Sequence, residues 1–213
     1  MFVVIEGIEG TGKSTVCGLV AELLRARGID VVVKPEFPEG ELAAEFREAL
    51  SKGLFLAQHL TMHPAAAFFY LAYAQVMTVS ATRPGGLTLG DRYLHTLAIY
   101  QSHFINAVPK PDPPILLASL EQLFATFGLP LPDVVFLLEA PLATIRERLT
   151  QREGRSPSEE EEMVMREFQE IYRRLRGGNK GALFFSIDAD RAPNEVARDI
   201  SQHLIEALPA SVI

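Results

Sequence analysis

The residues with the clearest chemical meaning stand near the start of the chain. The sequence GIEGTGKS, from Gly7 to Ser14, has the spacing G-x-x-x-x-G-K-[ST]. Glycines let such a loop curl so that successive backbone N–H groups converge on phosphate oxygens. Lys13 would then reach the β- and γ-phosphates, and the Ser14 hydroxyl would contact Mg²⁺. The spacing therefore predicts a binding site for a nucleoside triphosphate.

The segments on either side of this loop support the same interpretation. Phe2 to Ile5 is a short apolar run rich in β-branched residues, which is typical of a strand buried on both faces of a parallel sheet. An amphipathic helix is predicted to begin near Lys13 and to reach Arg27, where Gly28 ends it. Its positive dipole end adds to the attraction for phosphate. A glycine-rich turn that matches the motif by chance would lack this context.

An acidic and a basic residue follow another predicted strand. Asp91 and Arg92 come directly after Leu87 to Gly90. An acid at the carboxyl end of a parallel strand, beside a phosphate loop, is suited to Mg²⁺ and its waters, and the adjacent arginine is suited to an anionic acceptor. The alternative is a surface ion pair. We favour the ligand crevice, because ligands of open α/β sheets bind at strand ends.

The loop after the second predicted strand holds another candidate. Its proline- and glycine-rich segment, Lys34 to Gly40, follows Val31 to Val33 and contains Glu36. At the carboxyl end of a strand, Glu36 is either a carboxylate of the site or a solvated loop residue.

Arginines gather in the second half of the chain. A predicted helix over Pro141 to Gln151 carries Arg146 and Arg148, and Arg152 and Arg155 follow it. Positions 148 and 152 are four residues apart and share a helix face. Gly154 to Ser158 interrupts the helix, so we expect a lid at about residues 150–160. A capping box of Ser158 and Glu161 is expected to open the next helix.

Strands that alternate with helices predict an α/β protein with a five-stranded parallel sheet flanked by helices. With the phosphate-loop motif, this pattern indicates the three-layer fold of P-loop NTPases with a lid. Residues 1–213 are expected to form a single domain. The remaining predicted strands are Asp133–Leu138 and Leu183–Ile187. The remaining predicted helices are Glu41–Lys52, Pro64–Ala81, Ser119–Phe127, Ser158–Arg176 and Pro193–Leu208, and Asn106–Pro114 is predicted to be a loop.

Composition and charge narrow the range of partners. The net charge is −7, from 27 acidic and 20 basic residues, which disfavours nucleic acid as the main partner. No apolar run is long enough to span a membrane, and the chain opens directly on the first strand, so we expect a cytoplasmic protein. The single cysteine, Cys17, excludes an internal disulfide and is expected to be a buried thiol.

Most of the chain resembles the thymidylate kinase family of P-loop nucleoside monophosphate kinases. The matching segments, in order, are FVVIEGIEGTGKST, FPEG, FFYLAYAQ, GDRYLHTLAIYQ, PDVVFLLEAPLATIRERLTQREGR and FFSIDA. The order and spacing of these segments are more specific than any one of them. The resemblance implies ATP-dependent phosphorylation of a nucleoside monophosphate, most simply dTMP to dTDP, with Mg²⁺ as cofactor. It also suggests a homodimer formed through long apolar helices.

The resemblance also implies roles for individual residues. It assigns ATP to Gly7, Glu9, Gly10, Thr11, Gly12, Lys13, Ser14 and Thr15. It assigns the metal to Ser14 and Asp91, and the acceptor to Glu9, Phe37, Phe69, Tyr73, Arg92 and Tyr100. The predicted catalytic groups are Lys13, Glu36, Arg92, Arg148, Arg152 and Arg155. Phe69 takes the place of the aromatic residue that stacks on thymine in the family.

The sequence departs from the family pattern in its acceptor site. Arginines that are usual in the family are replaced by Gly40 or Pro35 in the loop and by Tyr73 in the long helix, with Arg47 as a candidate substitute. Tyr73 and Gln75 face either a cleft or the core. The loop around Glu36 also resembles that of deoxynucleoside kinases, in which a glutamate accepts the proton of a 5′-hydroxyl. A nucleoside kinase and a catalytically inactive nucleotide-binding module therefore stay open as alternatives.

Overall fold

A computed structural model describes residues 1–36, 48, 55, 63–79, 86–104, 109–176 and 182–207. The strands are β1 (Phe2–Glu6), β2 (Val31–Lys34), β3 (Leu87–Asp91), β4 (Val134–Glu139) and β5 (Leu183–Asp188). The helices are α1 (Lys13–Arg25), α4 (Pro64–Val79), α5 (Leu94–Phe104), α6 (Pro113–Thr126), α7 (Leu142–Glu153), α8 (Glu159–Arg176) and α9 (Pro193–Ala207).

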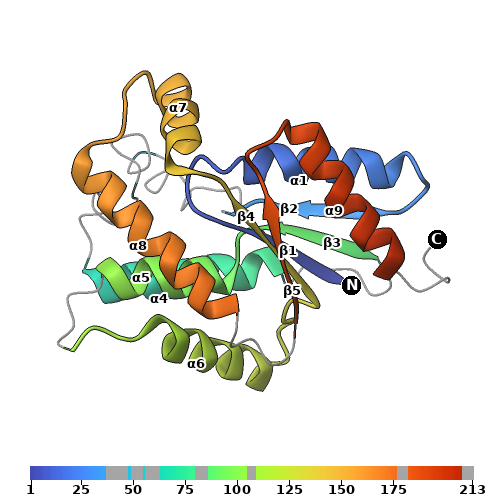
Figure 1. The fold of residues 1–213 in the computed structure, drawn as a ribbon. Helices are drawn as coiled ribbons and strands as arrows, with labels where there is room; N and C mark the ends of the chain where they lie inside the picture. Colours follow the sequence, from blue (N-terminus) through green and yellow to red (C-terminus); the bar gives the residue numbers. More distant parts are fainter. Residues whose placement is uncertain are drawn as a thin grey trace.

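Within these ranges the strands form one five-stranded parallel sheet in the order β2-β3-β1-β4-β5. Figure 1 shows three layers, with α1 and α9 on one face of the sheet and α4, α5, α6 and α8 on the other. The predicted α/β fold with a five-stranded parallel sheet is therefore confirmed. Among the described helices, none is both long and apolar enough to cross a bilayer.

The register brings the ends of the central strands to one edge of the sheet. Ile5 of β1 pairs with Asp91 of β3 on one side and with Phe136 of β4 on the other. Every residue of β1 and of β3 is buried, as expected for strands covered by helices on both faces. The phosphate loop leaves β1 at this edge, and α7 lies beyond the same edge (Figure 1).

Helices α6 and α5 differ most from the prediction. Helix α6 begins at Pro113, six residues before the predicted start at Ser119, so the C-terminal end of the predicted proline loop is helical. Proline is well tolerated in the first turn of a helix, where its missing N–H needs no partner. Helix α5 follows directly on Tyr93 and has no counterpart among the predicted helices. Nearly all of its side chains are buried, so it lacks the amphipathic pattern that signals a surface helix.

Other predictions agree with the structure. Ser158 and Glu161 form the expected capping box, with the Ser158 N–H donating to Glu161 Oε2 at 2.7 Å and the Glu161 N–H to Ser158 Oγ at 3.2 Å. Cys17 is buried in α1, and burial raises the pKa of its thiol well above the usual value. The predicted helix over Glu41–Lys52 lies outside the described residues, apart from Glu48.

Candidate active site

Lys13 is the first residue of α1 and lies over the phosphate loop. Its Nζ donates a 2.7 Å hydrogen bond to the Ile8 carbonyl, which also accepts a 2.8 Å bond from Thr11 Oγ1. The side chain is almost fully buried. Burial, together with the nearby charge of Arg92, lowers the pKa of Lys13 to about 8. An anion bound in the loop would replace the carbonyl as the partner of this ammonium group.

Asp91 ends β3 and faces the start of α1. Its Oδ2 accepts a 2.5 Å hydrogen bond from Ser14 Oγ, so the two residues that the resemblance assigns to the metal are in contact. Its Oδ1 is buried and has no hydrogen-bond partner within the described part of the chain. A buried carboxylate oxygen without a partner is costly unless a ligand satisfies it. Asp91 is therefore not half of a surface ion pair.

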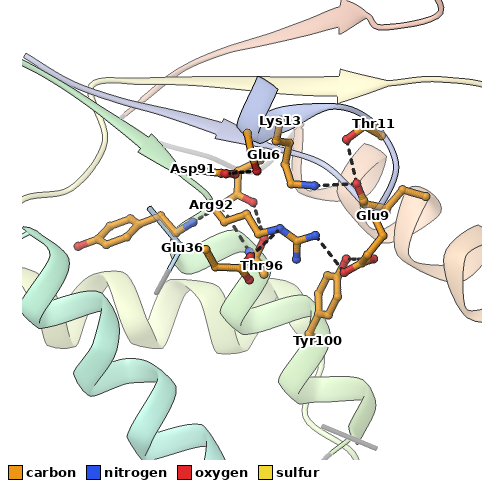
Figure 2. A network of polar contacts seen from close by, with 12 residues as sticks. Glu6, Glu9, Thr11, Lys13, Glu36, Asp91, Arg92, Thr96 and Tyr100 are labelled. Carbon is orange, nitrogen blue, oxygen red and sulfur yellow. Dashed lines mark hydrogen bonds and ion pairs between the residues drawn. The ribbon is translucent and has the colours of Figure 1, made fainter. Parts of the chain in front are cut away.

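Arg92 lies at the centre of a buried cluster of charges, which Figure 2 shows together with Lys13 and Asp91. Its Nη2 is 2.9 Å from Glu9 Oε1, and its Nε is 3.5 Å from Glu36 Oε2. The guanidinium carbon lies 5.0 Å from the centre of the Tyr100 ring, and Tyr100 Oη donates a 2.5 Å bond to Glu9 Oε2. Glu36 therefore lies next to Arg92 and is only partly exposed to solvent.

The pKa values of the two carboxyl groups beside Arg92 are shifted in opposite directions. Burial opposes the charge of Glu9, but Arg92, Lys13 and the Tyr100 hydroxyl more than offset it, so the pKa of Glu9 lies below its usual value. Burial dominates at Glu36, and the Asp91 charge adds to it, so the pKa of Glu36 rises to about 7. Glu9 is therefore a fixed anion at neutral pH, whereas Glu36 exchanges a proton there.

A cavity of about 430 Å³ opens on the other side of the phosphate loop. Thr15, Arg148, Arg152 and Pro193 are among the residues that line it. Helix α7 reaches the loop closely because Gly10 has no side chain: a Cβ there would lie 3.0 Å from side-chain atoms of Ile145 and Leu149. The volume is in the range of small-ligand sites.

The predicted catalytic arginines of α7 and of the segment after it have partners outside the Arg92 cluster. Arg148 donates to the Ala189 carbonyl at 2.9 Å and to the Arg191 carbonyl at 3.4 Å, so it is fixed at the wall of the cavity. Arg155 forms a bidentate ion pair with Glu161, in which each guanidinium nitrogen lies 2.7 Å from one carboxylate oxygen. Arg152 pairs with Glu153 at 2.6 Å. The structure does not bring these three arginines into contact with the Arg92 cluster.

Helix α4 places both of its predicted acceptor residues on its exposed side. Phe69 and Tyr73 are 69% and 47% exposed and lie on the outward side of the helix. Gln75 is buried, and its Nε2 donates a 3.5 Å bond to the Glu36 carbonyl. Phe68 lies seven residues before Gln75, on the same helix face, and packs against the core. The face of α4 that looks toward Glu36 therefore carries Phe68 and Gln75 rather than Phe69 and Tyr73.

Two further groups of residues bear on the predicted site. Phe37, Gly40 and Arg47 lie outside the described residues. Glu6, Thr96 and Tyr172 form a buried polar group next to Arg92 that the sequence analysis did not single out. Its signal in the sequence is a glutamate that directly follows an apolar strand segment and precedes Gly7.

The fold and this loop define a P-loop phosphotransferase of the nucleotide kinase class: a parallel sheet, a phosphate loop before α1, and an acid with an arginine at the end of the neighbouring strand. The comparison with family models is consistent with this, because the thymidylate kinase model matches residues 5–200. The chain belongs to the thymidylate kinase family, and with it to the ATP-dependent nucleotide kinases.

Curated relatives match over nearly the whole chain. A probable thymidylate kinase of Caldivirga maquilingensis is 30% identical over 206 residues, which cover 94% of this chain and 91% of that protein. A thymidylate kinase of Afipia carboxidovorans is 32% identical and covers 98% of this chain and 92% of its own length. One of Clavibacter michiganensis subsp. michiganensis is 32% identical, with 97% of each chain covered.

The lowered pKa of Lys13 predicts that nucleotide binding takes up a proton. At pH 8 about half of the Lys13 side chains are neutral in the free protein, and a bound triphosphate stabilises the charged form. Calorimetric titration with a non-hydrolysable ATP analogue at pH 8, in two buffers of different ionisation enthalpy, should show an uptake of about half a proton. The affinity should fall as the pH rises above 8.

The control for this measurement is Lys13→Arg, because a guanidinium does not titrate in this range. The same uptake in the variant would assign the proton to another group and contradict the prediction.

Proposed function

We propose that this protein transfers the γ-phosphoryl group of ATP to dTMP, giving dTDP and ADP. The observation that carries the proposal is the buried Arg92, held between Glu9 and Glu36 and adjacent to the phosphate loop. A buried guanidinium with two carboxylate partners is suited to exchange one of them for the phosphate of an acceptor. The names of the relatives support dTMP as that acceptor.

On the donor side, the loop N–H groups and Lys13 bind the triphosphate, and the base enters the cavity beside α7. Arg148 is held by two carbonyl groups, so its planar guanidinium offers a fixed surface for a nucleobase. A position beside the nucleobase accounts for the separation of Arg148 from the Arg92 cluster. A role at the transferred phosphoryl group would require Arg148 to lie closer to Arg92.

The residues at the end of β3 fit a magnesium ion. Ser14 Oγ and the two oxygens of Asp91 form a hard oxygen donor set, and Asp91 Oδ1 is buried with no hydrogen-bond partner among the described residues. When bound there, Mg²⁺ would neutralise charge on the β- and γ-phosphates, as in other P-loop kinases.

For the transfer itself, Lys13 and the loop N–H groups stabilise the charge that builds on the γ-phosphoryl oxygens. Arg92 orients the acceptor phosphate, and Glu9 and Tyr100 hold Arg92 from the other side. Residues 1–213 act as one kinase domain, whose lid at about 150–160 brings Arg152 and Arg155 over the reactants. Both arginines must first leave their glutamate partners. Lid closure excludes water, which would otherwise compete as acceptor.

The second candidate is phosphorylation of a nucleoside 5′-hydroxyl, and the position of Glu36 favours it. A general base works best when its pKa lies near the working pH, and the pKa of Glu36 is raised to about 7. The phosphate of dTMP is already ionised and needs no base. Glu36 therefore acts as a general base in the second candidate function and not in the first.

The experiment that separates the candidates measures ADP release with ATP and Mg²⁺ against dTMP, other monophosphates, thymidine and other nucleosides. We expect dTMP to be the preferred acceptor and Lys13→Ala to lower kcat/KM by about a hundredfold or more. Glu36→Gln should lower kcat with dTMP only mildly, because the variant keeps the polar group beside Arg92.

Preference for thymidine, with kcat of Glu36→Gln reduced by about a hundredfold or more, would favour the nucleoside kinase instead. ADP release that no acceptor increases would favour a catalytically inactive nucleotide-binding module.

We also propose that the protein acts in the cytoplasm as a homodimer, with nucleotides rather than nucleic acid or membrane as its ligands. Phe69, Tyr73 and Met77 are spaced four residues apart on α4 and are 69%, 47% and 48% exposed. Such a continuous apolar stripe on a helix favours contact with another protein surface. A second copy of the same helix presents the same stripe, and a twofold axis would pair the two.

Tyr73→Glu is predicted to weaken this dimer, because association would bury the introduced carboxylates against an apolar surface. Sedimentation velocity at micromolar concentration should show a dimer for the wild type and a monomer for the variant. Leu123→Glu, on α6, is the matched control because Leu123 is 48% exposed, like Tyr73. A wild-type monomer, or equal effects of the two substitutions, would contradict the prediction.

A further inference from the structure

Glu6 ends β1 and is completely buried. Its Oε1 accepts a 2.8 Å hydrogen bond from the Tyr93 backbone N–H. Its Oε2 accepts a 2.6 Å bond from Thr96 Oγ1 and a 3.0 Å bond from the Tyr172 hydroxyl. Figure 2 shows Glu6 and Thr96 directly beside Arg92. These contacts join the sheet to α5 and α8.

The partners of Glu6 are neutral hydrogen-bond donors. His95 Nδ1 lies 3.8 Å from Glu6 Oε1, and burial lowers the pKa of His95 below its usual value although the charge of Glu6 opposes this shift. Replacing a buried ionic group with an apolar residue of similar size is often neutral or stabilising. The position therefore calls for a role that an apolar side chain cannot fill.

The backbone of Arg92 supplies that role. Arg92 has φ of 69°, and it is the single non-glycine residue with positive φ among those that the structure describes. Side chains in this left-handed region are strained, and the conformation persists only where neighbouring contacts hold it. Here the N–H groups of two successive peptides are held: Arg92 donates to the Ile5 carbonyl at 3.0 Å, and Tyr93 donates to Glu6.

These two bonds fix the backbone on both sides of the Arg92 Cα, and through it the direction of the side chain. In that direction the guanidinium lies 2.9 Å from Glu9 Oε1 and 3.5 Å from Glu36 Oε2. Ile5 holds one peptide through its backbone, which no substitution alters. Glu6 holds the other through its side chain, so a substitution can test it.

We infer that Glu6 is a positioning residue for the acceptor-binding arginine: it holds the strained Arg92 backbone and so aims the guanidinium into the site. This inference rests on the proposed phosphoryl transfer, in which Arg92 orients the acceptor phosphate. The bond from Tyr172 extends the same support to α8, the helix that follows the candidate lid.

The test compares two substitutions of Glu6 in the full-length protein. Glu6→Met keeps the length of the side chain but leaves the Tyr93 N–H without an acceptor. Glu6→Gln keeps one carbonyl oxygen for that N–H and is the conservative rescue. Ser102→Ala is the control, since it removes another buried hydrogen bond of α5, from Ser102 Oγ to the Ile99 carbonyl.

We expect Glu6→Met to raise the KM of the acceptor about tenfold while the KM of ATP stays within about twofold. Glu6→Gln should recover most of this loss, and Ser102→Ala should show none. In an Arg92→Met background, Glu6→Met should add less than about a twofold effect, because the group that it positions is absent. An equal loss in both backgrounds, or a lower melting temperature with unchanged KM, would overturn the inference.

A second measurement does not depend on turnover. In protein labelled with ¹⁵N-arginine, the Nε–H of Arg92, assigned from its absence in Arg92→Met, should give a protected NMR signal. We expect Glu6→Met to shift or broaden this signal and Glu6→Gln and Ser102→Ala to preserve it. A wild-type protein without activity toward dTMP would refute the proposed function alone, whereas an unchanged Arg92 signal in Glu6→Met would refute the positioning role alone.

If Glu6→Met does not fold, Thr96→Val supplies the same comparison. It removes the 2.6 Å bond to the carboxylate and leaves the Arg92 contacts in place. It should raise the acceptor KM about threefold, and Thr96→Ser, which keeps the hydroxyl, should restore it. No difference between these two variants in KM or in the Arg92 signal would contradict the inference.

Discussion

The buried charge of Arg92 is the constraint on which the rest of the site depends. A guanidinium removed from water is stable only when anions or acceptors surround it. Glu9 from the phosphate loop, Glu36 from the loop after β2 and the Tyr100 ring from α5 meet this need together. Burial alone would lower the pKa of Arg92, but the charges of Glu36 and Glu9 raise it well above its usual value.

The same contacts connect the donor and acceptor sides of the site. Glu9 belongs to the loop that would bind the triphosphate, and it contacts the arginine that would bind the acceptor. The pKa of Lys13 depends on both residues, because the charge of Arg92 lowers it and the charge of Glu9 raises it. A charge bound on the donor side therefore changes the electrostatic potential on the acceptor side. This arrangement suits a reaction in which a phosphoryl group passes between two anionic nucleotides.

Much of the fold was predictable because its signals are local. The apolar runs, the helix-ending glycines and the G-x-x-x-x-G-K-[ST] spacing predicted the sheet, α1 and the phosphate loop, and the order of motifs predicted the family. Helix α5 was missed because almost all of its side chains are buried, so it shows no helical periodicity. Asp91, Arg92 and Glu36 were predictable as candidates, because each follows a strand at the edge where ligands bind.

Other features of the site depend on contacts between distant parts of the chain. No local pattern distinguishes Phe68 from Phe69 as the residue on the face of Gln75, since only the rotation of α4 decides it. The position of Arg148 depends on carbonyl groups that lie 41 and 43 residues later in the chain. The role of Glu6 depends on Tyr172, 166 residues later in the chain, and on a backbone angle at Arg92.

The most direct test of this account is the affinity of the acceptor for a protein without the central charge. In calorimetric titrations, Arg92→Met should bind dTMP at least about tenfold more weakly than the wild type, the loss expected for one charge-assisted hydrogen bond. Its affinity for a non-hydrolysable ATP analogue should stay within about threefold. Equal affinities of the two proteins for dTMP would contradict the account.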